Sequence, residues 1–158
     1  PLRIRVGITD RPEWDRYATD MDQNLLRLVQ VKAAASSEGT GAQGKAAAAI
    51  DRMTGVGWSP AAADAAPWLE ITLKKKLKTN QIVLSHGRPS SPRFGDFTIT
   101  INGKDKDAIK GSMTPDHRVK TVIQLEKPLP VGSLRIDFAG GPFEKPPSLG
   151  EVELRRVR

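Results

Sequence analysis

Apolar and polar residues alternate along most of this chain in the two-residue rhythm of β-strands. Successive side chains of a strand point to opposite faces, so such alternation is typical of a sheet with one face against a core. Turn residues separate the alternating runs, and helix signals are nearly absent apart from the run at residues 46–50, which is long enough for one helical turn. The predicted strands cover residues 2–8, 25–35, 69–73, 82–84, 97–101, 119–125, 134–138 and 151–154.

Turn signals support an all-β sandwich. Asn102-Gly103 directly follows one alternating run and is a strong signal for a tight hairpin turn. Most prolines after residue 88 fall at the joints between predicted strands, as expected for a residue that cannot donate to a sheet. Many short strands with regular turns are the pattern of an antiparallel sandwich or barrel.

The chain is short enough for one domain with a single core. It has 158 residues, 38% hydrophobic and 27% charged, and no apolar run approaches the length of a membrane span. It has no cysteine, so neither a disulfide framework nor a thiolate metal site is available. We expect residues 1–22 to be an N-terminal extension or a linker from an upstream domain, one that adds a strand if residues 2–8 join the sheet, and residues 23–158 to form the sandwich.

The formal net charge of +7 favours acidic partners, although solubility alone also explains such a charge. The densest cluster is Lys74, Lys75, Lys76 and Lys78, between two predicted strands. We interpret it as a solvated turn that protects a strand edge, with a polyanion site as the alternative.

Enzymatic signatures are missing from the sequence. It contains no Gly-x-Ser-x-Gly, no His-Glu-x-x-His and no phosphate loop. His86 and His117 are far apart in sequence, and Glu151 and Glu153 share a strand face that is predicted to lie far from the polar loops. The sequence therefore predicts a non-catalytic domain.

Three sequence blocks resemble the coagulation factor 5/8 type C (discoidin-like) domain, a galactose-binding-like β-sandwich. Residues 49–60 (AIDRMTGVGWSP) are similar to the family's Asp-turn-Trp segment, and residues 67–84 to its next two strands. Residues 128–141 and 147–154 are similar to its closing strands. The resemblance implies an antiparallel, jelly-roll-like sandwich of about eight strands.

The resemblance also implies a function in recognition. Many bacterial members are carbohydrate-binding modules of secreted or cell-envelope proteins, attached to other domains such as glycoside hydrolases or sulfatases. We therefore expect a carbohydrate partner, including acidic or sulfated polysaccharide, and neither nucleic acid nor a membrane span. The alternative is a structural or protein-docking sandwich without a sugar site.

The family resemblance places the ligand in loops at one end of the sandwich. His86 or Arg88 matches a polar ligand position, Ser91 falls near a position that is commonly Asn, and Phe143 matches a sugar-stacking position. Arg93 supplies a second guanidinium to the same loop, and a guanidinium can donate in a fork to vicinal hydroxyls, carboxylate or sulfate. A solvated loop and a Phe that caps the sandwich are the alternative interpretations. We expect Trp58 and Trp68 to pack in the core.

A structural Ca²⁺ site is a further implication of the resemblance. Asp51 and Glu151 stand at the expected positions, but Met53 and Val56 occupy places where oxygen-bearing side chains are common. Calcium needs six to eight oxygen ligands, so backbone carbonyls would have to complete the set. No other cofactor is expected.

Overall fold

The protein folds into a two-layered β-sandwich in which two long strands bend from one layer into the other. This computed structural model describes residues 4–8, 23–40, 44–53 and 55–157, and of residues 4–8 only the backbone. The strands are β1 (Ile4–Ile8), β2 (Val31–Ala35), β3 (Trp68–His86), β4 (Asp96–Ile101), β5 (Ile109–Ser112), β6 (Thr121–Phe138) and β7 (Leu149–Arg155). Three 3-10 turns accompany them: η1 (Leu25–Leu28), η2 (Ala46–Ala49) and η3 (Asp105–Asp107).

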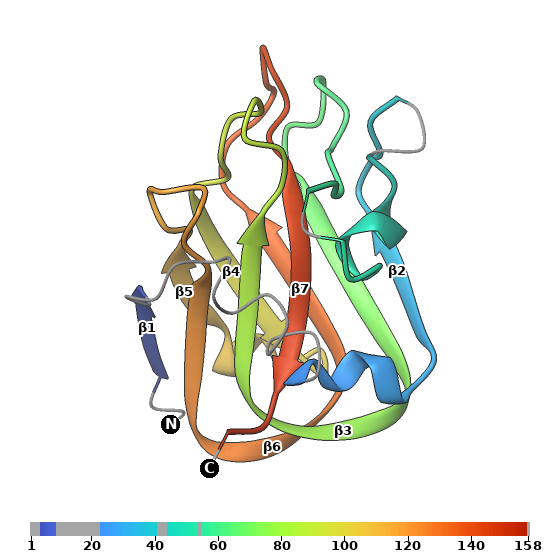
Figure 1. The fold of residues 1–158 in the computed structure, drawn as a ribbon, viewed down its shortest axis with the longest axis vertical. Helices are drawn as coiled ribbons and strands as arrows, with labels where there is room; N and C mark the ends of the chain where they lie inside the picture. Colours follow the sequence, from blue (N-terminus) through green and yellow to red (C-terminus); the bar gives the residue numbers. More distant parts are fainter. Residues whose placement is uncertain (1–3, 9–22, 41–43, 54, 158) are drawn as a thin grey trace.

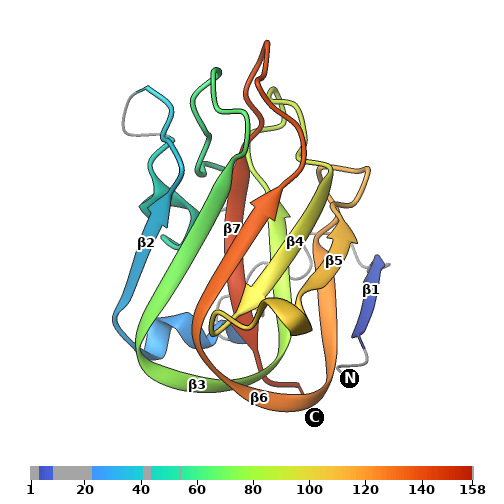
Figure 2. The same ribbon diagram turned by 180° about the vertical axis from the view of Figure 1, so that it is seen from behind.

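Strands β3 and β6 each serve both layers, as Figures 1 and 2 show from opposite sides. One layer has the order β2-β3-β6-β4-β5 and uses the first part of β3 with the last part of β6. The other layer pairs the last part of β3 with β7 and the first part of β6 with β1. All of these pairs are antiparallel. The expected all-β class and sandwich are confirmed.

The bend replaces a turn that the sequence pattern predicted. We expected separate strands at 69–73 and 82–84, but β3 runs continuously through both and pairs with β6 on either side of the bend. Strand β6 likewise joins the two expected runs at 119–125 and 134–138. Because each long strand contributes to both layers, the described part of the chain has seven continuous strands, whereas the expectation was about eight.

Alternation along the strands produces the core. Leu69, Ile71 and Leu73 are buried on β3, beside Ile99, Ile136 and other buried side chains of the neighbouring strands β4 and β6. Trp58 belongs to this core with no solvent exposure, as predicted, and its ring stacks on Phe94 with 5.5 Å between ring centroids. Burial of such side chains contributes about 1.5–3 kcal/mol each to folding.

Several smaller predictions are also settled by the fold. Residues 46–49 form one helical turn, as expected. Asn102 and Gly103 turn the chain with φ angles of 53° and 68°. Residues 4–8 pair with β6 as an added strand. The run 25–35 is only partly a strand, because η1 occupies residues 25–28. The pattern did not predict β5, whose sequence IKGS is too short to show alternation. No described helix is long and apolar enough to cross a membrane.

Candidate functional site

The loops at one end of the sandwich form the candidate site. Four connecting loops meet there: the loop after β2, the loop before β3, the loop between β3 and β4, and the loop between β6 and β7 (Figure 1). We call them together the apical loops, and define them as residues 36–40, 59–67, 87–95 and 139–148. The bends of β3 and β6 lie at the opposite end of the molecule.

Asp64 fastens the first two apical loops to each other. Its carboxylate accepts hydrogen bonds from the hydroxyls of Ser36, at 2.5 Å, and of Ser37, and from the backbone N–H of Ala66 at 3.1 Å. Burial acts to raise the pKa of Asp64, but these hydrogen bonds outweigh it and hold the pKa below its usual value. Asp64 is therefore an ionised bracing residue.

The loop between β6 and β7 packs closely against the same platform. Gly141 has a φ of +102°, and a Cβ atom at this position would lie 2.2 Å from the carbonyl oxygen of Asp64. Only glycine fits such an approach at such a backbone angle. The backbone N–H of Phe143 also donates to the carbonyl of Ala62 at 2.7 Å. These contacts determine where Phe143 stands.

The loops that carry the predicted ligand residues are joined through Ser148. Its carbonyl accepts from the N–H of Gly87 at 3.0 Å, and its hydroxyl accepts from the N–H of Arg88 at 2.8 Å. Lys145 adds a bond by donating to the carbonyl of Ser90 at 2.7 Å. The structure therefore brings the loop of Arg88 and Ser91 next to the loop of Phe143.

Four of the five predicted ligand residues reach the surface. Arg93 is exposed, while Arg88, Ser91 and Phe143 are half-buried. Partial burial is common for an aromatic ring or guanidinium that binds a ligand on one side and rests on its own protein on the other.

His86 differs from these four because its side chain is buried, with 3% of its surface exposed. Its Nε2–H donates to the carbonyl of Thr114 at 2.8 Å. The expectation of an exposed donor at this position is therefore not met. His86 shares the inward parity of Ile82 and Leu84 on β3, which explains its position beneath the loops.

His86 and His117 lie side by side although 31 positions separate them in the chain. Their ring centroids are 5.0 Å apart, and the Nδ1 atoms of both rings are buried without a hydrogen-bond partner among the described residues. Burial lowers the pKa of His86, and the nearby His117 and Arg93 act in the same direction. Burial thus disfavours the charged form of His86, which stands two residues before Arg88.

Trp68 is not a core residue, contrary to expectation. It is half-buried on the outer face of the sheet, and the guanidinium carbon of Arg135 lies 4.3 Å from the centroid of its ring. Asp137 holds that guanidinium in place, with its carboxylate 3.0 Å from Nη2 of Arg135. The inward parity of Leu69, Ile71 and Leu73 already placed Trp68 outward.

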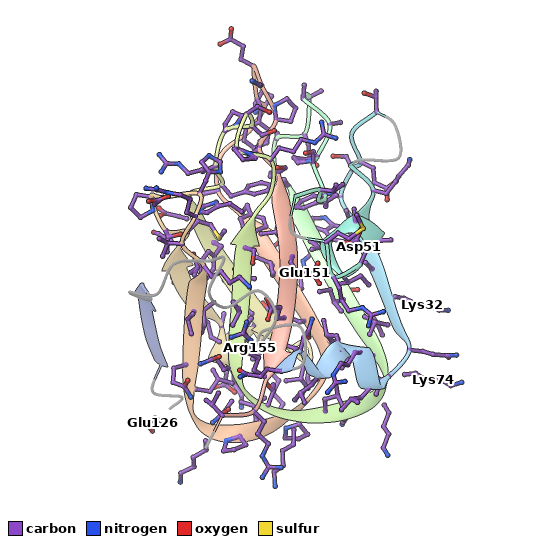
Figure 3. All side chains as sticks on the ribbon, viewed as in Figure 1. Lys32, Asp51, Lys74, Glu126, Glu151 and Arg155 are labelled. Carbon is purple, nitrogen blue, oxygen red and sulfur yellow. The ribbon has the colours of Figure 1, made fainter. Side chains whose placement is uncertain are left out.

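Asp51 and Glu151, the two expected calcium ligands, lie near each other, and Figure 3 labels both. Burial raises the pKa of Glu151 to about 9, and the charges of Asp51 and Glu153 add to the rise. Its Oε2 accepts from the N–H of Arg52 at 3.0 Å, whereas its buried Oε1 has no hydrogen-bond partner among the described residues. A divalent cation would fit that free oxygen in charge and in ligand type.

Glu153 and Arg155, the other buried charged residues of β7, pair with each other, and Lys120 also pairs with Glu153. Glu153 accepts from Lys120 Nζ at 2.9 Å and from Arg155 Nε at 2.8 Å, and all three side chains are buried. The carboxylate of Glu153 is thus bound by two cations. Among the described residues no three His, Asp or Glu side chains gather as a metal centre.

Sequence reasoning missed the residues that brace the loops. Asp64 is the lone acid in an alanine-rich stretch, which is a weak signal that it has a structural partner. Ser148 and Lys145 gave no signal, because their partners lie about 60 positions away and only the fold reveals them.

Comparisons with known proteins agree with this architecture. The family model of the F5/8 type C domain matches residues 32–146. No curated protein matches the chain in a sequence search.

Solved structures with similar folds include three carbohydrate-binding proteins. The NanJ family 32 carbohydrate-binding module of Clostridium perfringens in complex with galactose is 22% identical, with a TM-score of 0.62 over 78% of this chain and 92% of that one. Chitosan-binding module 1 of a chitosanase/glucanase from Paenibacillus sp. IK-5 is 21% identical, with a TM-score of 0.62 over 83% and 97%. The paired CBM32-1 and CBM32-2 domains of C. perfringens ZmpB are 17% identical, with a TM-score of 0.72 over 99% of this chain and 43% of that one.

The family model covers well over half of the 158 residues, and the sandwich and its apical loops are those that the sequence resemblance implied. The chain belongs to the F5/8 type C domain family.

Proposed function

We propose that this domain is a non-catalytic carbohydrate-binding module that binds a glycan at its apical loops. The observation that carries the proposal is the joining of two loops through Ser148, which brings Phe143 next to Arg88 and Ser91. An aromatic ring buries the apolar face of a sugar, and guanidinium and hydroxyl groups bind its hydroxyls. The similar structures described with galactose or as a chitosan-binding module support the same ligand class.

Within this site Phe143 is the stacking platform and Arg88, Ser91 and Arg93 are the polar contacts. His86 acts from beneath as a positioning residue, because its buried ring holds Thr114 and lies directly against His117. Such a shallow site binds a single sugar weakly and gains strength through repetition on a larger protein. The domain would thus hold the other domains of its polypeptide, outside the cell or in the cell envelope, on a polymer.

Affinity electrophoresis tests this proposal. The domain is run through gels containing galactan, chitosan or dextran at low and high salt, beside the variants Phe143→Ala and Arg88→Ala. We expect retardation by at least one polymer that survives high salt and is lost in both variants. Lys110→Ala, an exposed residue on β5, is the control and should migrate as the unmodified domain does. Absence of retardation in every gel would contradict the proposal and favour a structural or protein-docking role.

We further propose that Glu151 and Asp51, completed by backbone carbonyls, hold a structural Ca²⁺. The free buried Oε1 of Glu151 supports this, because a buried carboxylate oxygen without a partner is costly unless a cation binds it. Thermal unfolding with and without calcium tests the site. Calcium should raise the melting temperature of the unmodified domain and leave Glu151→Gln unchanged, whereas equal behaviour of both proteins would contradict it.

A further inference from the structure

A second charged surface lies at the end of the molecule opposite the apical loops. Lys74, Lys75, Lys76 and Lys78 are exposed on the bend of β3, and Lys127 is exposed on the adjoining bend of β6. We call these five lysines the basic bend. Strand β3 begins at Trp68, next to the apical loops, and at about 3.3 Å per residue Lys75 is roughly 23 Å further along it. In Figures 1 and 2 the two bends close the lower end of the sandwich, away from those loops.

Strand pairing covers only part of the segment that carries these lysines. Strand β3 pairs with β6 on one side, and on its other side it pairs with β2 up to Leu73 and with β7 from Gln81 onward. The N–H of Lys74 is bonded to the carbonyl of Gln30, and Lys78 is paired with Pro130 of β6. Among the described residues no strand pairs with the β2 and β7 side of residues 75–80, so protection of this edge and binding of an anion are compatible roles for the lysines.

The positive charge of the basic bend is not neutralised by ion pairs within the part of the chain that the structure describes. The salt bridges recorded there involve Lys45, Lys120, Arg118, Arg135 and Arg155, and none involves the basic bend. Glu126 is the one acidic residue within the two bent segments. Figure 3 shows the side chain of Lys74 directed away from the body of the sandwich.

Packing beneath the lysines gives the surface a defined shape. The aliphatic stem of Lys76 lies over Gly132, where an added Cβ would stand 3.2 Å from its Cγ. Asn102 ties the same region together by accepting from the N–H of Gly132 at 2.7 Å and donating to the carbonyl of Pro130 at 2.8 Å. The ammonium groups therefore project from a braced strand pair.

The chemistry of the basic bend selects among anionic partners. The two bent segments, residues 74–80 and 126–132, contain no aromatic residue on which nucleic-acid bases could stack. Their apolar residues Leu77 and Leu129 are half-buried and pack against the core, so they cannot insert into a lipid surface. A polysaccharide with regularly repeated sulfate or carboxylate groups needs only an array of cations at its surface.

We propose that the basic bend is a second binding site, which takes sulfated or carboxylated polysaccharide independently of the apical loops. One domain could then engage a neutral sugar at one end and an acidic polymer at the other. This inference does not rest on the proposed apical site, since each end can bind when the other is removed.

The test compares two triple variants that lose the same charge. The bend variant is Lys74→Gln, Lys75→Gln and Lys78→Gln, which spares the packed Lys76. The control variant is Arg52→Gln, Lys110→Gln and Arg118→Gln, which are all exposed and lie outside the two bent segments. Matching melting temperatures establish that both variants fold.

Binding to heparin, polygalacturonate and dextran is measured by fluorescence titration at low and moderate salt. We expect the bend variant to bind heparin and polygalacturonate about tenfold more weakly and with a smaller salt dependence, because fewer counterions are released. The control variant should change by less than about threefold, and Arg88→Ala should bind the acidic polymers normally.

Two outcomes would overturn the proposal. Equal losses in the two triple variants would mean that diffuse net charge, and not the basic bend, attracts the polymers. Tighter binding of duplex DNA, or of phosphatidylserine vesicles, than of either acidic polysaccharide would mean that the partner class is wrong. If Arg88→Ala alone loses binding to dextran or galactan, that loss concerns the apical site and does not bear on the basic bend.

Discussion

At the scale of single residues, two carboxylates in this domain have opposite environments. Asp64 receives three hydrogen bonds that favour its ionised form, and Glu151 receives one and is buried beside two other acids. Their pKa values accordingly move in opposite directions from ordinary values. Asp64 and Glu151 therefore lead to different predictions of how the stability of the domain depends on pH.

Replacing Asp64 with Asn should destabilise the domain by about 1–3 kcal/mol, because the charge-assisted bonds from Ser36 and Ser37 are lost. Because the pKa of Asp64 is lowered in the folded state, its carboxylate stabilises the fold at pH values above its unfolded pKa. This stabilisation is lost as the pH falls through the folded-state pKa. Urea unfolding at pH 7 and below pH 4 measures the effect, which should shrink in acid.

The control for this change is Asp96→Asn, an exposed aspartate that accepts from the hydroxyl of Ser112. It should cost less than about 0.5 kcal/mol, as most surface substitutions do. An equal cost at both positions would contradict the bracing role assigned to Asp64.

Glu151→Gln should stabilise the calcium-free domain at alkaline pH. With a folded-state pKa of about 9 and an ordinary value of 4.5, folded Glu151 retains a proton that the unfolded chain releases, so stability falls as pH rises across that interval. The gain in the free energy of unfolding should be on the order of 1–3 kcal/mol at pH 8 and should vanish near pH 4. Denaturation in EDTA at the two pH values measures it, and parallel pH profiles would refute it.

At the scale of elements, the loop before Trp58 approaches β7 closely. Gly57 is buried there, and a Cβ atom would stand 2.0 Å from the carbonyl oxygen of Leu149. Trp58 and Leu149 exchange two backbone hydrogen bonds at 3.0 and 2.9 Å, which depend on this approach.

Gly57→Ala should therefore destabilise the domain by about 1–3 kcal/mol through overpacking against backbone. Gly55→Ala, two residues earlier, is a matched control because nothing lies within 4 Å of its added Cβ. Thermal unfolding of the two variants gives the comparison. Similar melting temperatures of the two variants would show that the loop can shift to accept the added methyl group and that its contact with β7 contributes little to stability.

Element by element, the sequence pattern predicted strands well where one face is buried. The inward parity of Leu69, Ile71 and Leu73 was evident and explains why Trp68 is outside. His86 instead follows Ile82 and Leu84, whose parity is set after the register shifts at the bend. The bend was missed because a run of lysines is typical of a turn. Pairing with β6 on both sides of the bend overrides that local preference, and such pairing is a long-range property that a single sequence does not display.

At the scale of the whole molecule, the long bent strands separate two surfaces of different chemistry. The apical loops present the half-buried ring of Phe143, two guanidiniums and hydroxyls, whereas the basic bend consists of lysines alone. The loop carrying Arg88 and Ser91 could be located from the family resemblance, but the burial of His86 could not. Its partner Thr114 lies 28 positions away, so the contact exists only in the folded sandwich.

The central claim is that a sugar binds at the apical loops, and a titration of the ¹⁵N-labelled domain with galactose, N-acetylgalactosamine and chitosan oligosaccharide tests it most directly. The account predicts that amide shifts in two-dimensional NMR spectra concentrate at residues 87–93 and 140–145, while the amides of the basic bend stay in place. Shifts confined to other surfaces, or no shifts with any of the three sugars at millimolar concentration, would contradict it.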